Sequence, residues 1–262
     1  MASALFFDVD GTLIDSYHGN RTISDAVMNE LGRVRDQGHR LFLSSGRPKV
    51  LIMPELASVG FDGMVLINGG YVEMADEPIY EERMGHELAA DTLAFLRESG
   101  YEYMLVCARR NYMHPDNAGF IEFFSRDAHS FEYGFADESL LDEVIKFEAL
   151  VPVDEREKVV RAVRKRFGDV VSCDGHGGAG TFELFPTAIS KAKGIDAVLD
   201  HLGIDRSQAY GFGDGTNDIE MLAACGTGVA MGNAEEVVKE AADLVCGPVW
   251  EDGLADALRM LF

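Results

Sequence analysis

An uninterrupted apolar run near the start of the chain, Ala4–Phe7, is followed at once by two carboxylates, Asp8 and Asp10. A run of this kind is typical of a strand that is buried on both faces, as in a parallel sheet. Side chains two residues apart share one side of an extended chain, so both carboxylates are predicted to converge where the strand ends. Gly11 comes next and permits the backbone angles of a tight exit.

Two neighbouring carboxylates repel each other, which disfavours having both ionised unless a cation or a proton intervenes. Asp8 and Asp10 therefore predict either a Mg²⁺ site with hard oxygen ligands or a pair divided into a charged nucleophile and a protonated acid. A structural alternative is a helix N-cap or a turn, because aspartates are common at strand exits. The rest of the chain decides between these interpretations.

Further apolar runs of strand length follow, and segments with helical spacing separate them. Asp25–Gln37 is one such helix, with Ser24 as its expected N-cap. This alternation predicts parallel strands with helices on both faces, an α/β fold with a Rossmann-like doubly wound sheet. Pro54 predicts a kink or a break in a helix expected over 49–59. The segments Leu244–Cys246 and Leu254–Leu261 are expected to complete the core. The other expected strands are Arg40–Leu43, Met64–Ile67, Ala209–Phe212 and Gly228–Met231, and the other expected helices are Lys191–Leu202, Ile219–Cys225 and Glu235–Ala242.

The middle of the chain has a different character. It contains a helix expected to be capped by Asp154, and two strand-like segments, Asp169–Cys173 and Thr181–Phe185, on either side of a glycine-rich loop. Antiparallel strands with helices, bounded on both sides by parallel-type units, indicate an inserted α+β domain. We therefore expect a core formed by residues 1–82 and 186–262, with residues 83–185 inserted into it.

Polar residues follow several of the predicted parallel strands. Ligands of open α/β sheets bind beyond the carboxyl ends of the strands, so these residues are expected to surround one crevice. Aspartates there suit Mg²⁺, and hydroxyl, amide and backbone N–H groups suit phosphate oxygens. Alternatives remain open. Taken alone, Lys191 is equally compatible with a surface lysine, and GDGTND is compatible with a loop or an incomplete EF-hand. The strand-end residues are Asp8, Asp10, Ser45, Gly46, Arg47, Asn68, Asp214, Asn217 and Asp218, with Lys191 at a helix start beside them.

Composition limits the partners and the compartment. The net charge of −22 disfavours nucleic acid and anionic membranes as partners. No apolar run reaches the roughly 18 residues of a membrane span, and acidic residues arrive too early for a signal peptide. The four cysteines form no CxxC pair, which favours inert thiols in a reducing compartment. A cytoplasmic protein is expected, and the sequence does not indicate its oligomeric state.

The motifs DVDGT, SSGR, SKAKG and GFGDGTND occur in this order, and together they resemble the haloacid dehalogenase superfamily of phosphotransferases. The large insertion between the second and third motifs, and the NGG before it, resemble the Cof-type branch with a type IIB cap. Many relatives have Ala-Thr where this chain has Ser44-Ser45, which leaves the register of the phosphate-binding hydroxyl open by one residue.

The resemblance implies roles for most of the strand-end residues. Asp8 would be the nucleophile, and Asp10 the general acid for the leaving alcohol and then the base for water. Phosphate would be held by Ser45, the backbone near Gly46, Lys191 and Asn217. Mg²⁺ would be bound by Asp8, the backbone carbonyl of Asp10, and Asp214, and Asp218 would support it directly or through water.

The expected function is that of a Mg²⁺-dependent phosphatase that acts on a small phosphorylated metabolite, such as a sugar phosphate, through an aspartyl-phosphate. A phosphomutase is the nearest enzymatic alternative, and a non-catalytic phosphate-binding regulator is a more distant one. Because the core motifs leave nothing to recognise the leaving group, the inserted domain is expected to select the substrate. Its candidate contacts are Arg109, Arg110, Tyr112, His114 and the loop Asp174–Gly180 with His176.

Overall fold

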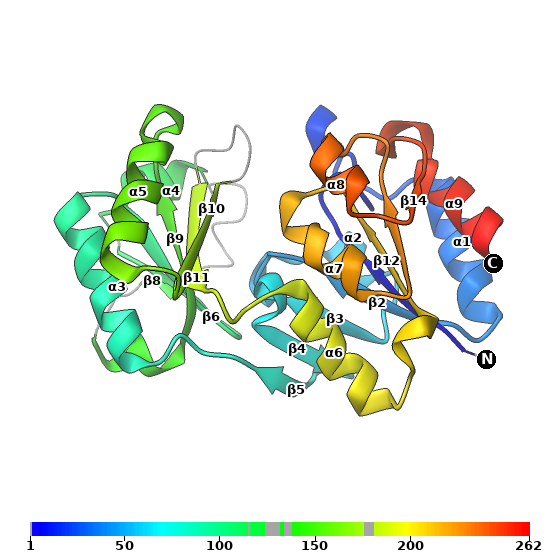
Figure 1. Cartoon of the computed structure of the whole chain (residues 1–262), viewed down its shortest axis with the longest axis horizontal. Coiled ribbons are helices and arrows are strands. Elements are labelled where there is room, and N and C mark those ends of the chain that lie inside the picture. The colour runs from blue at the N-terminus through cyan, green and yellow to red at the C-terminus, as the bar shows by residue number, and fades with distance from the viewer. Residues whose placement is uncertain (1, 115, 124–131, 134–137, 176–180) are drawn as a thin grey trace. The chain divides into compact units, whose positions relative to one another are not determined.

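The computed structural model describes residues 2–114, 116–123, 132–133, 138–175 and 181–262. The chain separates into two compact units (Figure 1). Unit 1 comprises Met1–Arg47, Ile52–Glu81 and Ser190–Phe262, and unit 2 comprises Pro48–Leu51 and Glu82–Ile189.

Unit 1 is built on an eight-stranded sheet with the order β14-β13-β12-β1-β2-β3-β4-β5. The first six strands in this order pair in parallel, and β4 and β5 add an antiparallel hairpin at one edge. The strand order runs outward in both directions from the neighbouring strands β12 and β1, so the connections that follow these two strands lead to opposite sides. Open α/β sheets bind ligands at such a point. The strands are β1 (Ala4–Phe7), β2 (Arg40–Ser44), β3 (Gly63–Leu66), β4 (Tyr71–Met74), β5 (Glu77–Glu81), β12 (Ala209–Gly213), β13 (Thr227–Ala230) and β14 (Leu244–Val245).

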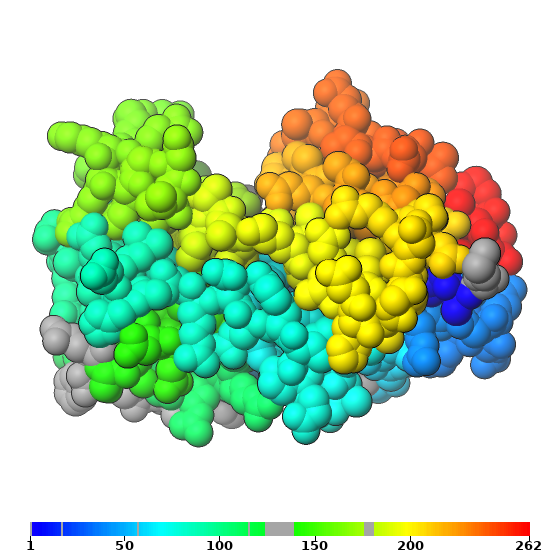
Figure 2. Space-filling view, turned by 60° about the horizontal axis from the view of Figure 1, so that its bottom comes forward, coloured from blue at the N-terminus to red at the C-terminus, as the bar shows by residue number. Residues whose placement is uncertain are grey.

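Helices cover this sheet on both faces, which confirms the predicted α/β class. Ser24 caps the first helix as expected, since its hydroxyl accepts a hydrogen bond from the N–H of Val27 at 3.2 Å. Helices α1 and α9 contact each other, as do α6 and α7, and α6 forms part of the outer surface of unit 1 (yellow in Figure 2). The helices are α1 (Asp25–Asp36), α2 (Pro54–Ala57), α6 (Lys191–Leu202), α7 (Ile219–Ala224), α8 (Glu236–Glu240) and α9 (Gly253–Leu261).

The central strands of unit 1 carry apolar side chains on both faces of the sheet, since both faces are buried under helices. Phe6 stacks on Phe42 with ring centroids 5.0 Å apart, within the cluster that includes residues of α6 and α7. Phe7, on the opposite side of the pleat, stacks on Phe212 at the same spacing. This two-sided packing fixes the position of the β1 end, and with it the start of the Asp8–Asp10 segment.

Unit 2 contains a six-stranded sheet with the order β10-β11-β9-β6-β7-β8. All of its pairings are antiparallel except β7 with β8. Helices α3 and α5 contribute to the apolar cluster on one face of the sheet, whereas Lys146 and Glu183 form a buried ion pair. The elements are α3 (His86–Ser99), β6 (Tyr103–Cys107), β7 (Asn111–Met113), α4 (Ala118–Phe123), β8 (Glu132–Tyr133), β9 (Val144–Leu150), α5 (Arg156–Phe167), β10 (Val171–Gly175) and β11 (Thr181–Pro186).

One local prediction is confirmed and another is wrong. The break expected at Pro54 in the helix over 49–59 is present, since a 3₁₀ turn, Lys49–Leu51, is followed by the separate helix α2, which begins at Pro54. Proline has no N–H to donate, so it is tolerated in the first turn of a helix and not in the interior. Asp154 does not cap α5, because it lies in a preceding 3₁₀ turn and the N-cap position falls on Glu155.

None of the described helices combines the length and the apolar character that crossing a bilayer requires.

Candidate active site

The chain leaves β1 through a tight turn that places Asp8 beside β12. The N–H of Asp8 donates to the carbonyl of Phe212 at 2.9 Å, and Val9 O accepts from the N–H groups of Leu13 and Ile14. Gly11 has φ +90°, and a Cβ there would lie 2.2 Å from Asp214 Oδ2. Both the backbone angle and the contact therefore require glycine at this position.

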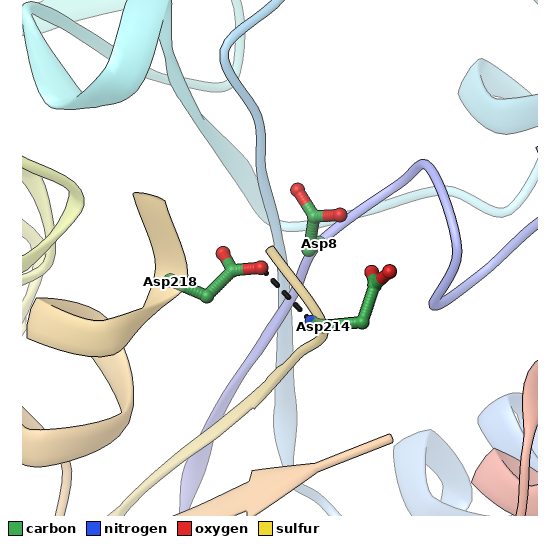
Figure 3. A group of neighbouring side chains, drawn as sticks. All are labelled: Asp8, Asp214 and Asp218. Atoms are coloured by element: carbon green, nitrogen blue, oxygen red, sulfur yellow. Dashed lines mark hydrogen bonds between the residues drawn. The ribbon is translucent and has the colours of Figure 1, made fainter. Parts of the chain in front are cut away.

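The loop after β12 is organised by Asp218. Its Oδ2 accepts hydrogen bonds from the backbone N–H groups of Asp214 at 3.0 Å and Gly215 at 2.9 Å. Figure 3 shows the first of these bonds and the convergence of Asp8, Asp214 and Asp218 on one region. Asp218 is fully buried, so these bonds fix both its own carboxylate and the backbone that carries Asp214.

Lys191 joins the two loops. It is the first residue of α6, whose N-cap Ser190 accepts from the N–H of Lys193. Its Nζ lies 2.6 Å from Asp8 Oδ1 and 2.6 Å from Asp218 Oδ1. The side chain of Lys191 is fully buried, so the interpretation of Lys191 as a surface lysine is wrong.

Electrostatics at this cluster strongly favour a cation. Burial raises the pKa of Asp8 well above its ordinary value, the carboxylates of Asp218 and Asp214 raise it further, and only Lys191 opposes them. Burial lowers the pKa of Lys191, but the attraction of Asp218 and Asp8 outweighs that effect, so its pKa lies above the ordinary value. Lys191 therefore stays charged, and the pKa of Asp8 is raised even though Lys191 lies beside it.

Asp8, Asp214 and Asp218 offer carboxylate oxygens that all lie within 4.8 Å of one another, so this group could hold a metal ion. Asp214 is oriented by two neutral side chains. Its Oδ1 accepts from Thr12 Oγ1 at 3.0 Å, and its Oδ2 accepts from Asn233 Nδ2 at 3.1 Å. Oxygen donors held by further hydrogen bonds fit a hard divalent cation such as Mg²⁺.

Asp10 does not belong to this carboxylate group. Its two oxygens each lie 2.8 Å from a guanidinium nitrogen of Arg47, a bidentate ion pair, and its side chain is partly exposed. β1 ends at Phe7, so the regular alternation of an extended strand does not continue to Asp10, whose carboxylate pairs with Arg47. The carboxylates that meet Asp8 come instead from the loop after β12.

Ser44 and Ser45 lie in different surroundings at the end of β2. Ser44 lies within β2 and is fully buried, and its hydroxyl has no hydrogen-bond partner. Ser45 follows the strand end, and its Oγ accepts from the N–H of Arg47 at 3.2 Å. Asn217 Nδ2 donates to Asn68 Oδ1 at 3.1 Å, and Gly46 lies against the same Asn68 oxygen.

Sequence reasoning gave no role to Thr12, Asn233 or Arg47. Thr12 lies inside the DVDGT motif, so its position two residues after Asp10 was a usable signal. Asn233 also donates to the carbonyl of Gly11 at 2.9 Å and accepts from the N–H of Val249. It comes from the loop after β13 in an ordinary MGNA segment, and nothing in that pattern indicates a contact with Asp214.

The fold is that of a known enzyme family. The chain matches the sequence profile of the haloacid dehalogenase-like hydrolases over residues 5–258. The chain belongs to this family. The resemblance noted from the four motifs is thereby confirmed.

Individual relatives agree with this assignment. YkrA of Bacillus subtilis, provisionally named a phosphatase, is 31% identical, with 98% of this chain and 96% of that protein covered. The protein YitU of the same organism, named 5-amino-6-(5-phospho-D-ribitylamino)uracil phosphatase, is 28% identical, with 97% and 96% covered. The solved structure of a subclass IIB sugar phosphatase superposes with a TM-score of 0.84 at 29% identity, covering 99% of this chain and 98% of that one. These similarities support phosphatase activity for the chain.

Proposed function

We propose that the chain is a Mg²⁺-dependent phosphatase that hydrolyses a small phosphorylated metabolite through an aspartyl-phosphate on Asp8. The observation that carries this proposal is the buried contact of Lys191 with both Asp8 and Asp218, beside Asp214. A buried carboxylate beside a lysine, in a group of carboxylates that could hold a cation, is suited to attack a phosphorus atom.

Each candidate residue of unit 1 has its own role in the proposed reaction. Asp8 attacks phosphorus, and the phosphoryl group passes to its carboxylate while the alcohol leaves. Ser45, Lys191 and Asn217 bind the phosphate oxygens. Mg²⁺ held by Asp8 and Asp214 would offset negative charge on the transferring group. Asp218 holds Lys191 and the Asp214 backbone in place, since its oxygens already accept from both.

Asp10 transfers a proton in both steps of the proposed reaction. It donates a proton to the leaving alcohol oxygen, and as a carboxylate it later takes one from the water that attacks the phosphorus of the acyl phosphate. In the structure both oxygens of Asp10 accept hydrogen bonds from Arg47. Asp10 therefore acts as an acid only after it exchanges Arg47 for the leaving oxygen.

Phosphate release from a panel of phosphate monoesters tests the function. Inorganic phosphate should appear from several esters, including an aryl phosphate. Conversion of a hexose phosphate to an isomer without phosphate release would favour the phosphomutase. Binding of phosphate without any turnover would favour the regulatory protein.

Metal dependence is the first consequence. Exhaustive chelation should abolish turnover, because Asp8 would then remain in a cluster that disfavours its charge. Added Mg²⁺ should raise the melting temperature, because a ligand that binds only the folded state stabilises it. Stability and turnover should be measured on the same chelated sample during Mg²⁺ titration. Full activity after chelation would contradict the proposal.

Asp10→Asn should lower kcat by about 10²- to 10⁴-fold, the usual range for a general acid–base group. The loss should be larger for alkyl phosphates than for an aryl phosphate, because a good leaving group needs less protonation. Asp15→Asn is the matched control, since Asp15 follows the same exit turn and its side chain hydrogen-bonds only to His18 among the described contacts. Equal losses on both substrate types would remove Asp10 from the role of acid.

We propose further that unit 2 selects the substrate and that the substrate is a phosphate ester of a sugar or a sugar-derived alcohol. The proteins named above as a sugar phosphatase and a ribitylaminouracil-phosphate phosphatase support this class. Among the candidate contacts, Arg109 and Arg110 are exposed at the β6–β7 turn. Tyr112 packs against the apolar cluster of unit 2, which favours a packing role, and 176–180, with His176, lies outside the described residues.

Alanine substitution of Arg109, Arg110 and His114 tests this division of roles. The measured quantity is kcat/KM for sugar phosphates relative to an aryl phosphate. A change in the order of preferred substrates supports the assignment to unit 2. A uniform profile across all three variants would exclude these residues as substrate contacts.

A further inference from the structure

The turn between β3 and β4 is held in a backbone conformation that Ile67 would ordinarily avoid. Ile67, Asn68 and Gly69 have φ values of 53°, 55° and 95°. Positive φ is tolerated by glycine and often by asparagine, but a β-branched residue such as isoleucine rarely adopts it. Strain of this kind persists only where the surroundings fix it, and it is concentrated at functional sites.

The surroundings that fix this turn are two loops of the candidate active site. The N–H of Asn68 donates to Ser45 O at 3.1 Å, and the N–H of Ile67 donates to Arg47 O at 3.2 Å. On the other side, a Cβ on Gly69 would lie 2.0 Å from the carbonyl oxygen of Ser190, the residue before Lys191. The turn is thus packed between the Ser45 loop and the start of α6.

The side chain of Asn68 is directed into this site and is almost completely buried, with 4% of the residue exposed. Its Oδ1 accepts from Asn217 Nδ2 at 3.1 Å. A Cβ on Gly46 would lie 2.7 Å from the same oxygen, so the Asn68 amide fills the space beside Gly46. Asn68 therefore contacts both Gly46 and Asn217, two of the residues proposed to bind phosphate.

The contact with Asn68 decides which end of the Asn217 amide faces which group. The carbonyl end of Asn217 lies against Gly215, where a Cβ would be 2.6 Å from Asn217 Oδ1. The NH₂ end gives one N–H to Asn68, and an amide has a second N–H to offer. A phosphate dianion only accepts hydrogen bonds, so the reverse orientation would present a repelling carbonyl to it.

We infer that Asn68 is a positioning residue, which acts through Asn217 by holding its NH₂ end toward the phosphate. This role rests on the proposed function. Asn68 itself touches no reacting atom, and it transmits the geometry of the strained turn to the phosphate-binding residues. The alternative is that Asn68 only stabilises the turn.

Asn68→Gly separates the two roles, because glycine adopts the positive φ and only the amide is lost. The variant should keep a melting temperature close to that of the wild type. Its kcat/KM should fall by about tenfold, the equivalent of one lost hydrogen bond to a group that must be oriented. The affinity for inorganic phosphate, measured by titration calorimetry, should fall by a similar factor.

A double-mutant cycle with Asn217→Ala identifies the route of the effect. If Asn68 acts through Asn217, Asn68→Gly should change phosphate affinity by less than about twofold when Asn217 is already absent. Asp76→Gly is the matched control, because Asp76 has φ 64° in the β4–β5 turn of the same sheet. The control should leave phosphate affinity and kcat/KM unchanged.

Additive effects of Asn68→Gly and Asn217→Ala would overturn the inference, as would a wild-type phosphate affinity in Asn68→Gly. Failure of the proposed function gives a different result, because the wild type would then release no phosphate from any ester. The calorimetric cycle uses inorganic phosphate alone, so it tests the positioning role even in that case.

Discussion

Asp8→Asn is expected to abolish turnover and, in the absence of metal, to make the protein more stable. The loss of activity should be at least about 10³-fold, since a missing nucleophile is among the most damaging changes to an active site. Stability should rise because the ionised Asp8 carboxylate is disfavoured by burial and by Asp218 and Asp214. Asparagine has nearly the same shape and carries no charge.

The size of the stability gain depends on pH. The ordinary pKa of an aspartate, which applies to Asp8 in the unfolded chain, is 3.8. In the folded protein the pKa of Asp8 lies well above that value, mainly because of burial. The folded state therefore binds more protons than the unfolded state between these two values, and stability falls as the pH rises through this window. Asp8→Asn removes this loss, so its advantage in melting temperature should be small below about pH 4 and larger at neutral pH.

Melting temperatures of both proteins, measured after chelation from pH 4 to pH 8, test the stability part. Turnover of an aryl phosphate at saturating Mg²⁺ tests the activity part. Asp8→Asn with more than a few per cent of the wild-type rate would reassign the nucleophile. A variant less stable than the wild type at neutral pH would contradict the electrostatic account of the cluster.

Lys191→Met is expected to cost both stability and activity. Lys191 is the cation shared by Asp8 and Asp218, and removing one partner of a buried ion pair typically costs about 3–5 kcal/mol. Turnover should fall for all phosphate esters alike, with a higher KM and a lower kcat, because Lys191 is proposed to contact only the phosphate. Chemical denaturation and steady-state kinetics on several esters measure the two effects.

Lys193→Met is the matched control for this variant. Lys193 is exposed on the same first turn of α6, so its loss should change the free energy of unfolding by no more than about 0.5 kcal/mol. A double variant, Lys191→Met with Asp218→Asn, removes one of the two carboxylates and should recover part of the lost stability. An effect of Lys191→Met that differs strongly between substrates would place Lys191 elsewhere in the mechanism.

The sequence predicted the parts of the site that follow from regular elements. Helix α6 begins at Lys191 as expected, and parallel strands bring Asp8 and Asp214 to one edge because their carboxyl ends meet there. The alternation argument did not indicate the partner of Asp10, because β1 ends at Phe7. Its contact with Arg47 depends on the path of two loops, which no pattern within either loop specifies.

Neutral supporting residues were the hardest to predict. Asn233 orients Asp214 from the loop after β13, and Asn68 contacts Asn217 across 149 positions of sequence. Asparagine in a loop usually indicates only a turn, because its side chain readily satisfies nearby backbone groups. Only the tertiary packing shows that these amides face the carboxylates and glycines of the site.

The aspartyl-phosphate is the central claim, and its most direct test is chemical trapping. Asp10→Asn should slow the attack of water on the intermediate, so the acyl phosphate should accumulate when this variant turns over an aryl phosphate with Mg²⁺. Borohydride reduces an acyl phosphate on aspartate to homoserine, which peptide mass spectrometry locates. We predict homoserine at position 8, and none in the Asp8→Asn variant. Homoserine at another aspartate, or none at position 8 during measurable turnover, would contradict the proposed mechanism.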